Sequence, residues 1–332
     1  MKKIFKIVIT DYIEQPDIEY EVLGNDVDII CLCENNEKEF SDIIEDADIL
    51  MAWHAEITKY TINRLKKCKA IMRIGSGYDN VDIVFAREQG IPVTNVPDYG
   101  THEVADTTCS MILALARGLS MYNHLSKHYV SGWQENFIPE LKRMGNHNLG
   151  IIGMGRIGTA VGLRMKAFNI DIAFYDPYVV EGYEKSLGVK RLSSLIDLLS
   201  FASIISINTP LNEETINMVN QDFINKMNPG SILINTARGK IVESLSVIYE
   251  ALDIGKLAGV GLDVLPVEPP SNNELLIKVW KNPDNPLSSK IIITPHTAFY
   301  SEAAWNEMRF KAAKNACDIL SGSEPKNVIN DL

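Results

Sequence analysis

The feature that most constrains the fold of this chain is an alternation of short apolar runs with amphipathic stretches, which occurs twice. The first series contains "KIFKIVITD", "VDIICL", "ADILMAW", "AIMRIGSG" and "IPVTNVP". The second contains "LGIIGMG", "DIAFYDP", "SIISINTP", "SILINTARG", "AGVGLDV" and "KIIITPH". Strand-like runs that alternate with helical segments are typical of βαβ units and parallel sheets. We therefore predict an α/β protein with two parallel sheets, the second of about six strands.

The length of 332 residues favours two domains, because one hydrophobic core rarely grows so large. Residues 101–128 contain no proline and predict one long helix between the two series. A further amphipathic helix, "EAAWNEMRFKAAKNACDILSG", follows the second series and fits most simply on the first domain. We expect a domain of residues 102–297 inserted into a discontinuous domain of residues 1–101 and 298–332, with a cleft between them. The Pro-, Asn- and Ser-rich stretch from Val267 to Lys290 predicts a loop insertion.

The net charge of −11 argues against nucleic acid and anionic membranes as partners, so we expect a small-molecule partner. No run of about 18 apolar residues occurs, and the first residues reach Asp11 before a signal-peptide core could form. The five cysteines are scattered without a C-x-x-C pair, which indicates reduced thiols. We expect a cytoplasmic protein.

Three glycines spaced G-x-G-x-x-G, at Gly153, Gly155 and Gly158, end the first strand of the second series. The helical stretch "RIGTAVGLRMKAF" overlaps and follows them, and the next strand ends in Asp176. A dinucleotide site needs this strand, helix and acid, because backbone amides hold the pyrophosphate and the acid bonds the adenine ribose. Asp176 would also repel a 2′-phosphate, so the pattern predicts NAD rather than NADP. A glycine turn without a ligand is the alternative interpretation.

Three charged residues follow strands of the same series and are expected at one sheet edge: Arg238, Glu268 and His296. Taken singly, each has an ordinary structural explanation. Arg238 could form a surface salt bridge, Glu268 could be a solvated loop acid, and His296 could be a hydrogen-bonded core imidazole. His124 and His128 have i, i+4 spacing on a helix but no supporting ligand, so we expect no metal site.

Four motifs in order, "GIIGMGRIG", "INTARGKIV", "GVGLDVLPVEPP" and "ITPHTAFYSEAA", resemble the D-isomer-specific 2-hydroxyacid dehydrogenase family. The stretches "MRIGSGYDNVDI", "NVPDYGTHEVADTT" and "TPHTAFYSEAAWNEM" are similar to its branch that contains the C-terminal-binding proteins. The resemblance implies a Rossmann NAD-binding domain inserted into a flavodoxin-like substrate domain.

The resemblance also implies catalytic roles. Arg238 would grip the substrate carboxylate and polarise the keto oxygen. His296 would donate a proton to that oxygen as NADH delivers hydride to the carbon. Glu268 would place a negative charge beside the ring, orient it and favour its protonated form.

Cofactor and substrate positions can be transferred from the family in the same way. Those for NAD are Ser76, Gly153, Gly155, Arg156, Ile157, Gly158, Asp176, Thr209, Pro210, Thr215, Thr236, Ala237, Arg238, Asp263, His296 and Phe299, with Asp263 expected to face the nicotinamide amide. The backbone amides of Gly75, Ser76 and Gly77 would hold the substrate carboxylate. The positions that would line the pocket for the substrate's side chain are Trp53, His54, Arg73, Phe299 and Met308. Such a group of aromatic and methionine side chains is equally typical of a core.

Several positions depart from the family pattern. Ser203 stands where many relatives have Asp, Asn208 replaces a frequent His, and Phe299 replaces a Trp. The segment between Glu268 and His296 is longer than in the corepressor branch, which leaves substrate choice open.

We expect an NAD-dependent oxidoreductase that interconverts a 2-keto acid and a D-2-hydroxy acid and forms a homodimer through the helix after residue 101. One alternative is an NAD(H)-sensing, corepressor-like interaction protein on the same fold. Another is a phosphite-type dehydrogenase. Formate enzymes of this fold have Gln where Glu268 stands, which argues against formate.

Overall fold

The computed structural model of the chain describes residues 4–24, 26–127, 133–134, 137–138 and 141–330. The chain forms two compact units, one of residues 1–100 and 300–332 and the other of residues 101–299. Sequence analysis places these boundaries after residues 101 and 297. Both units are α/β structures built on a parallel sheet, as expected.

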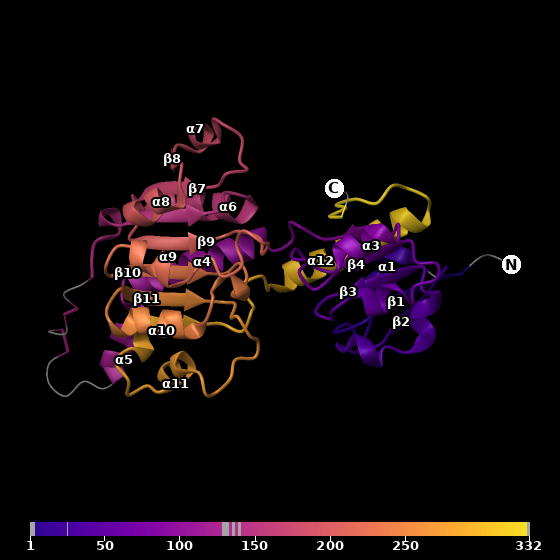
Figure 1. Cartoon of the computed structure of the whole chain (residues 1–332), viewed down its shortest axis with the longest axis horizontal. Coiled ribbons are helices and arrows are strands. Elements are labelled where there is room, and N and C mark those ends of the chain that lie inside the picture. Colours follow the sequence, from indigo (N-terminus) through magenta and orange to yellow (C-terminus); the bar gives the residue numbers. More distant parts are fainter. Residues whose placement is uncertain (1–3, 25, 128–132, 135–136, 139–140, 331–332) are drawn as a thin grey trace. The chain divides into compact units, whose positions relative to one another are not determined.

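Unit 1, the discontinuous unit, has a five-stranded parallel sheet in the order β2-β1-β3-β4-β5, which is the flavodoxin-like order. Its strands are β1 (Phe5–Ile9), β2 (Val27–Cys31), β3 (Ile49–Ala52), β4 (Ala70–Arg73) and β5 (Val93–Thr94), and its helices are α1 (Asp17–Leu23), α2 (Lys59–Ile62), α3 (Ile83–Glu88) and α12 (Glu302–Leu320). The late helix α12 packs on α1 and β4, and Figure 1 shows it in yellow among the indigo elements. Its buried face carries Ala304, Met308, Ala312 and Ala316 at the four-residue spacing of a helix.

Unit 2 has a seven-stranded parallel sheet in the order β12-β11-β10-β9-β6-β7-β8. Its strands are β6 (Asn148–Ile152), β7 (Asp171–Tyr175), β8 (Lys190–Arg191), β9 (Ile204–Ile207), β10 (Ser231–Asn235), β11 (Leu257–Leu262) and β12 (Ile291–Ile293). Its helices are α4 (Thr101–Ala116), α5 (Leu119–Lys127), α6 (Arg156–Met165), α7 (Tyr183–Leu187), α8 (Leu195–Phe201), α9 (Gln221–Lys226), α10 (Leu245–Asp253) and α11 (Leu275–Lys281).

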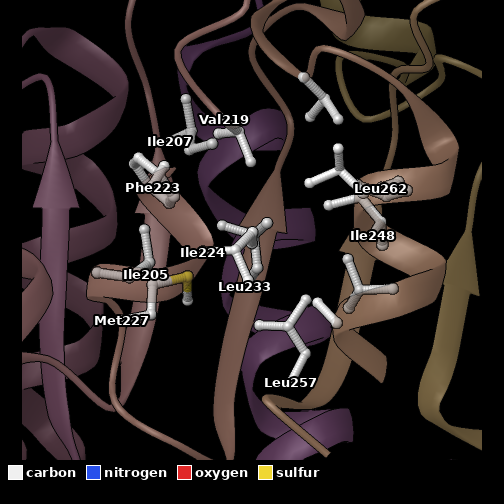
Figure 2. Packing of buried hydrophobic residues seen from close by; sticks show 14 of the residues in the cluster. Ile205, Ile207, Val219, Phe223, Ile224, Met227, Leu233, Ile248, Leu257 and Leu262 are labelled. Atoms are coloured by element: carbon white, nitrogen blue, oxygen red, sulfur yellow. The ribbon is translucent and has the colours of Figure 1, made fainter. Parts of the chain in front are cut away.

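Helices cover both faces of this second sheet. Ile205 and Leu233 face α9 and α10, where Ile224 and Ile248 complete the packing shown in Figure 2. Their neighbours along the strands, such as Ile204 and Ile234, join a separate cluster with α4 and α6. Successive side chains of a strand point to opposite faces, so strands buried on both faces are apolar throughout.

Two expectations about local structure are wrong. The long helix expected over residues 101–128 is broken between α4 and α5 at Gly118, which has a left-handed φ of 63°. Glycine adopts this conformation without the steric cost other residues meet, so it ends the helix where no proline is present. His128 lies outside the described residues.

The expected loop insertion from Val267 to Lys290 contains helix α11. Leu276 and Ile277 on this helix are fully buried against the sheet of unit 2. The five apolar residues within "ELLIKVW" therefore outweigh the Pro and Asn residues around them. Within the described residues, no helix combines the length and apolar character that a membrane crossing requires.

Strand order marks where each unit can bind a ligand. In an open parallel sheet, a crevice forms at the carboxyl ends of the two strands from which the order runs in opposite directions. These strands are β1 and β3 in unit 1, and β6 and β9 in unit 2.

Candidate active site

The glycine fingerprint forms the turn between β6 and α6. This turn lies at the carboxyl end of β6, one of the two strands from which the order of the unit 2 sheet runs in opposite directions, a position called the switch point. Gly153 has a φ of 87°, and a Cβ atom there would lie 2.7 Å from the carbonyl oxygen of Asn208. A Cβ atom on Gly158 would lie 2.1 Å from the carbonyl oxygen of Gly153. A Cβ atom on Gly155 would meet open space. Two glycines therefore allow the tight turn, and the third leaves the backbone open to a ligand.

Asp176 follows β7 and holds this turn in place. Its Oδ2 accepts a hydrogen bond from the Met154 amide at 2.8 Å, and its Oδ1 accepts one from the Tyr178 amide at 2.9 Å. The acid expected to bind the cofactor ribose thus also fixes the glycine turn. The hydroxyl of Tyr178 donates to Glu214, which ties the segment after β7 to the loop after β9.

The loop after β9 presents polar atoms at the same edge. Within the described part of the chain, the buried Oγ1 of Thr209 and Oδ1 of Asn208 have no hydrogen-bond partner. Thr215 donates to the carbonyl oxygen of Pro210 at 2.7 Å and so closes the loop. Buried polar atoms without a partner are rare, and a polar ligand would satisfy them. The open glycine turn, Asp176 and these two atoms fit a dinucleotide.

His296 and Glu268 are in direct contact. The ring Nδ1 of His296 lies 2.8 Å from Oε2 of Glu268, and Oε1 of Glu268 accepts the Leu265 amide at 2.7 Å. A carboxylate only accepts hydrogen bonds, so Nδ1 of His296 is the donor in this contact. Both side chains are about one-third exposed, at 35% and 37%. A partner molecule can therefore reach the ring.

Asp263, at the end of β11, holds the loop that carries His296. Its carboxylate accepts the Thr294 hydroxyl at 2.6 Å and the amides of Thr297 and Ala298 at 2.9 and 3.0 Å. Its backbone carbonyl accepts the His296 amide at 2.8 Å. His296 has a left-handed φ of 54°, which is uncommon for a non-glycine residue and needs such support. The expected contact of Asp263 with the nicotinamide amide stays a prediction.

Arg238 lies in the turn after β10 and is half-buried, with Nη1 donating to the carbonyl oxygen of Ala237 at 2.8 Å. Asn235 shapes this turn, because its side chain bonds the Arg238 carbonyl at 2.9 Å and the Ala237 amide at 3.0 Å. The Thr236 hydroxyl bonds that of Thr108 on α4 at 2.7 Å. Since β10, β11 and β12 are neighbouring parallel strands, Arg238, Glu268 and His296 all follow strands at one sheet edge.

In unit 1, the loop expected to hold a carboxylate follows β4. Asn95 donates to the Ser76 carbonyl at 2.6 Å, and the Val96 amide donates to the Gly75 carbonyl at 2.9 Å. Arg73 donates to the Ile74 carbonyl at 2.5 Å, and its guanidinium lies against Gly75. These contacts fix the carbonyl groups of Gly75 and Ser76, and the expected binding of a carboxylate by the amides of Gly75–Gly77 stays a prediction.

Trp53 and His54 follow β3, and their loop is anchored by residues that sequence analysis did not single out. The buried carboxylate of Asp11 accepts the amides of Trp53, His54 and Ala55 at 2.9, 2.6 and 3.2 Å. Asn80 donates to the carbonyl oxygens of Trp53 and Ala55 at 3.2 and 2.8 Å. The sequence signal for Asp11 was its position directly after an apolar strand.

The side chains assigned to the substrate pocket differ in burial. Met308 is fully buried on the inner face of α12, and its assignment to the pocket stays a prediction. Trp53 is only 6% exposed, whereas His54 is exposed. Phe299 is half-buried at the end of unit 2. His147 is buried, and its Nδ1 lies 3.1 Å from Ser203 Oγ.

Comparisons with known proteins show the family to which the chain belongs. Residues 109–298 match the family described as D-isomer specific 2-hydroxyacid dehydrogenase, NAD binding domain. The chain is 32% identical over 326 residues to D-3-phosphoglycerate dehydrogenase of Methanocaldococcus jannaschii, with 98% of this chain and 59% of that protein covered. It is also 32% identical over 321 residues to C-terminal-binding protein 1 of Caenorhabditis elegans, with 94% of this chain and 42% of that protein covered.

The fold is shared with D-lactate dehydrogenase from Aquifex aeolicus, solved with NAD and lactic acid. The TM-score is 0.83 at 26% identity, with 95% of this chain and 96% of that chain covered. The chain belongs to the D-isomer-specific 2-hydroxyacid dehydrogenase family. Its unit 2 is the NAD-binding domain of this family, and NAD is its cofactor. The chain spans about half the length of the curated relatives named above.

Proposed function

We propose that this protein reduces a 2-keto acid to a D-2-hydroxy acid with NADH. The observation that carries the proposal is the contact of His296 Nδ1 with Glu268 Oε2 at 2.8 Å, at the sheet edge where Arg238 also lies. An acid–base imidazole oriented by a carboxylate, next to a guanidinium, matches the needs of carbonyl reduction.

Each residue has a role that follows from its chemistry. Arg238 offers a planar fork of donors that binds the carboxylate of the keto acid and polarises its carbonyl oxygen. Glu268 accepts the Nδ1 proton of His296 and so stabilises the charged ring. The Nε2 proton of His296 then passes to the keto oxygen. When bound, NADH would supply the hydride that the keto carbon gains.

The cofactor contacts proposed for unit 2 begin at the glycine turn. Gly155, Arg156 and the first amides of α6 would hold the pyrophosphate, and Asp176 would bind the adenine ribose. The unpartnered hydroxyl of Thr209 would bond the cofactor at the carboxyl end of β9.

The test is the loss of NADH absorbance with pyruvate, glyoxylate, hydroxypyruvate and phenylpyruvate, followed by chiral analysis of the product. We expect the D-enantiomer and a steady-state rate that depends on His296. His296→Ala should lower kcat at least about 100-fold, because it removes the proton donor. His102→Ala, at an exposed histidine of the same unit, should stay near the parental rate.

Reduction by His296→Ala at the parental rate would remove His296 from the mechanism. Tight NADH binding without turnover of any 2-keto acid would instead support a protein that senses the cofactor, since C-terminal-binding protein 1 has the same identity to this chain as the dehydrogenase.

We also propose that the protein forms a homodimer through the region after residue 101. In the described part of this region, Leu119 and Leu125 on α5 and Trp133 and Phe137 beyond it are exposed, Phe137 at 79%. Large apolar side chains gathered on one segment are typical of an interface.

A further inference from the structure

Helix α4 packs closely on β10 and β11 of unit 2, because glycines on β11 leave room for its side chains. A Cβ atom on Gly259 would lie 3.0 Å from the Leu115 side chain, and one on Gly261 would lie 3.0 Å from the sulfur of Met111. The two glycines alternate along β11 and therefore face the same side of the sheet. They set the distance between α4 and the sheet, and so fix the position of the helix.

Thr108 lies on the same buried face of α4, one turn before Met111. Its hydroxyl donates to the carbonyl oxygen of Val104, one turn earlier on the same helix, at 2.7 Å. The hydroxyl of Thr236, directly after β10, lies 2.7 Å from the Thr108 hydroxyl. A threonine hydroxyl carries one proton, and that of Thr108 goes to Val104. Thr236 therefore donates to Thr108, and this bond links the end of β10 to α4.

The bond between the two hydroxyls is shielded from water. Thr108 has no exposed surface, and Thr236 is 7% exposed. A hydrogen bond in such a place contributes more than one at the surface, because water cannot replace a lost partner. Removal of the Thr108 hydroxyl would leave the Thr236 hydroxyl buried without the acceptor of its proton. The turn that begins at Thr236 would then lose this attachment to the helix.

This turn carries Arg238, two residues after Thr236. The Asn235 side chain bonds the Arg238 carbonyl and the Ala237 amide at 2.9 and 3.0 Å. These bonds shape the turn but lie within it, so they do not set its position relative to the helices. The bond from Thr236 to α4 does so. Position matters here, because paired hydrogen bonds from a guanidinium to a carboxylate need close alignment.

We propose that Thr108 is a positioning residue, which holds the Arg238 turn through the Thr236 hydroxyl so that the guanidinium meets the substrate carboxylate. The proposal rests on the proposed function, in which Arg238 binds that carboxylate. Thr108 has no exposed surface and therefore acts on the substrate through the turn alone. The role requires a hydroxyl at this position, since valine has nearly the same shape but offers no acceptor to Thr236.

The first experiment follows amide hydrogen exchange of the full chain by mass spectrometry and needs no substrate. In Thr108→Val, the amides of residues 236–241 should exchange at least about fivefold faster than in the native protein, because the turn opens more often. Thr108→Ser and Thr108→Ala differ only in the hydroxyl, so the serine variant should exchange like the native protein and the alanine variant like Thr108→Val.

Ser110→Ala is the matched control, because this exposed hydroxyl donates to the Asp106 carbonyl within the same helix at 2.7 Å. It should leave exchange in the turn unchanged. Circular dichroism of each variant shows whether it is folded. Equal exchange in the native protein and in folded Thr108→Val would overturn the inference, whatever the activity of the protein.

The second experiment measures kcat/KM for the 2-keto acid that the native protein reduces fastest, with NADH in saturating amount. We expect Thr108→Val to lower kcat/KM about tenfold and Thr108→Ser to restore it. In an Arg238→Lys background, Thr108→Val should change kcat/KM less than about twofold, because the fork that the turn positions is already absent. Fully additive losses would show that Thr108 does not act through Arg238 and would overturn the inference. If the native protein reduces no 2-keto acid, only the proposed function fails, and hydrogen exchange still decides whether Thr108 holds the turn.

Discussion

At the scale of single residues, buried polar side chains of this chain hold the loops that carry its chemistry. Asp263 holds the His296 loop, Asn235 holds the Arg238 turn, and Asp11 holds the Trp53 loop. Each bonds to backbone groups, so nothing in the identity of the bonded residues reveals the contact. Motif and strand position could therefore single out Arg238, Glu268 and His296. They could not reveal that Asn235 and Asp11 position the loops. Asp263 was singled out, but for a contact with the cofactor.

His147 leads to a prediction about pH at this scale. Burial, with the positive charges of Lys142 and Arg117, lowers the pKa of His147, and its Nε2 is buried without a partner in the described structure. The unfolded chain therefore takes up a proton near pH 6.5 that the folded chain resists. Stability is fully present above that pH and falls as the pH drops below it.

Replacement of His147 by Gln should remove this part of the acid sensitivity. Urea unfolding at about pH 7.5 and about pH 5.5 should show a smaller loss of stability in the variant than in the native protein. His102→Gln, at an exposed histidine, serves as the control. The same loss in native protein and His147→Gln would show that this histidine does not couple folding to pH.

At the scale of elements, apolar periodicity predicts the strands well, because parallel strands buried on both faces are apolar throughout. Sequence patterns predict the helices less well. Gly118 ends α4 through a left-handed φ inside a stretch expected to be one helix, and α11 forms in a segment whose composition indicates a loop. Backbone conformation decides the first case, and burial of Leu276 and Ile277 against unit 2 decides the second.

The attachment of α12 to α1 depends on Arg309. Burial lowers the pKa of Arg309, but bonds to Glu19 and Asp17 outweigh this effect and raise it. Glu19 is fully buried, and its carboxylate lies 2.5 Å from Nη2 of Arg309. Arg309→Ala would leave this carboxylate buried without its cation.

We expect Arg309→Ala to lower the free energy of unfolding by about 3 to 5 kcal/mol. Lys314→Ala, which removes an exposed pair with Asp318 on the same helix, should cost much less, because solvent screens the pair. Chemical denaturation monitored by tryptophan fluorescence measures both. An equal loss of unfolding free energy in the two variants would show that the buried Arg309–Glu19 pair contributes no more to stability than the exposed Lys314–Asp318 pair.

At the scale of the whole molecule, the proposed homodimer leads to a test of the region after residue 101. Leu119→Glu combined with Trp133→Glu places two charges on exposed apolar positions, which a dimer interface would have to bury. Sedimentation velocity should then show monomer at concentrations where the native chain is dimeric.

Ile254→Glu, at an exposed apolar residue of unit 2 outside this region, should leave the sedimentation of the native protein unchanged. A native chain that sediments as a monomer, or a double variant that stays dimeric, would contradict the proposed interface.

The sequence by itself determined the two parallel sheets, the glycine turn, Asp176 and the motif residues at the strand ends, because the apolar runs of buried strands and glycine geometry are properties of a few neighbouring residues. Tertiary structure alone decided which side chains meet at the edge of unit 1. Tyr12, Trp53 and Trp305 are far apart in sequence, and only the strand order of unit 1 and the return of α12 bring their rings together. Met308, three residues after Trp305, is buried by the same packing. Contact and burial depend on the whole fold, which no local pattern contains.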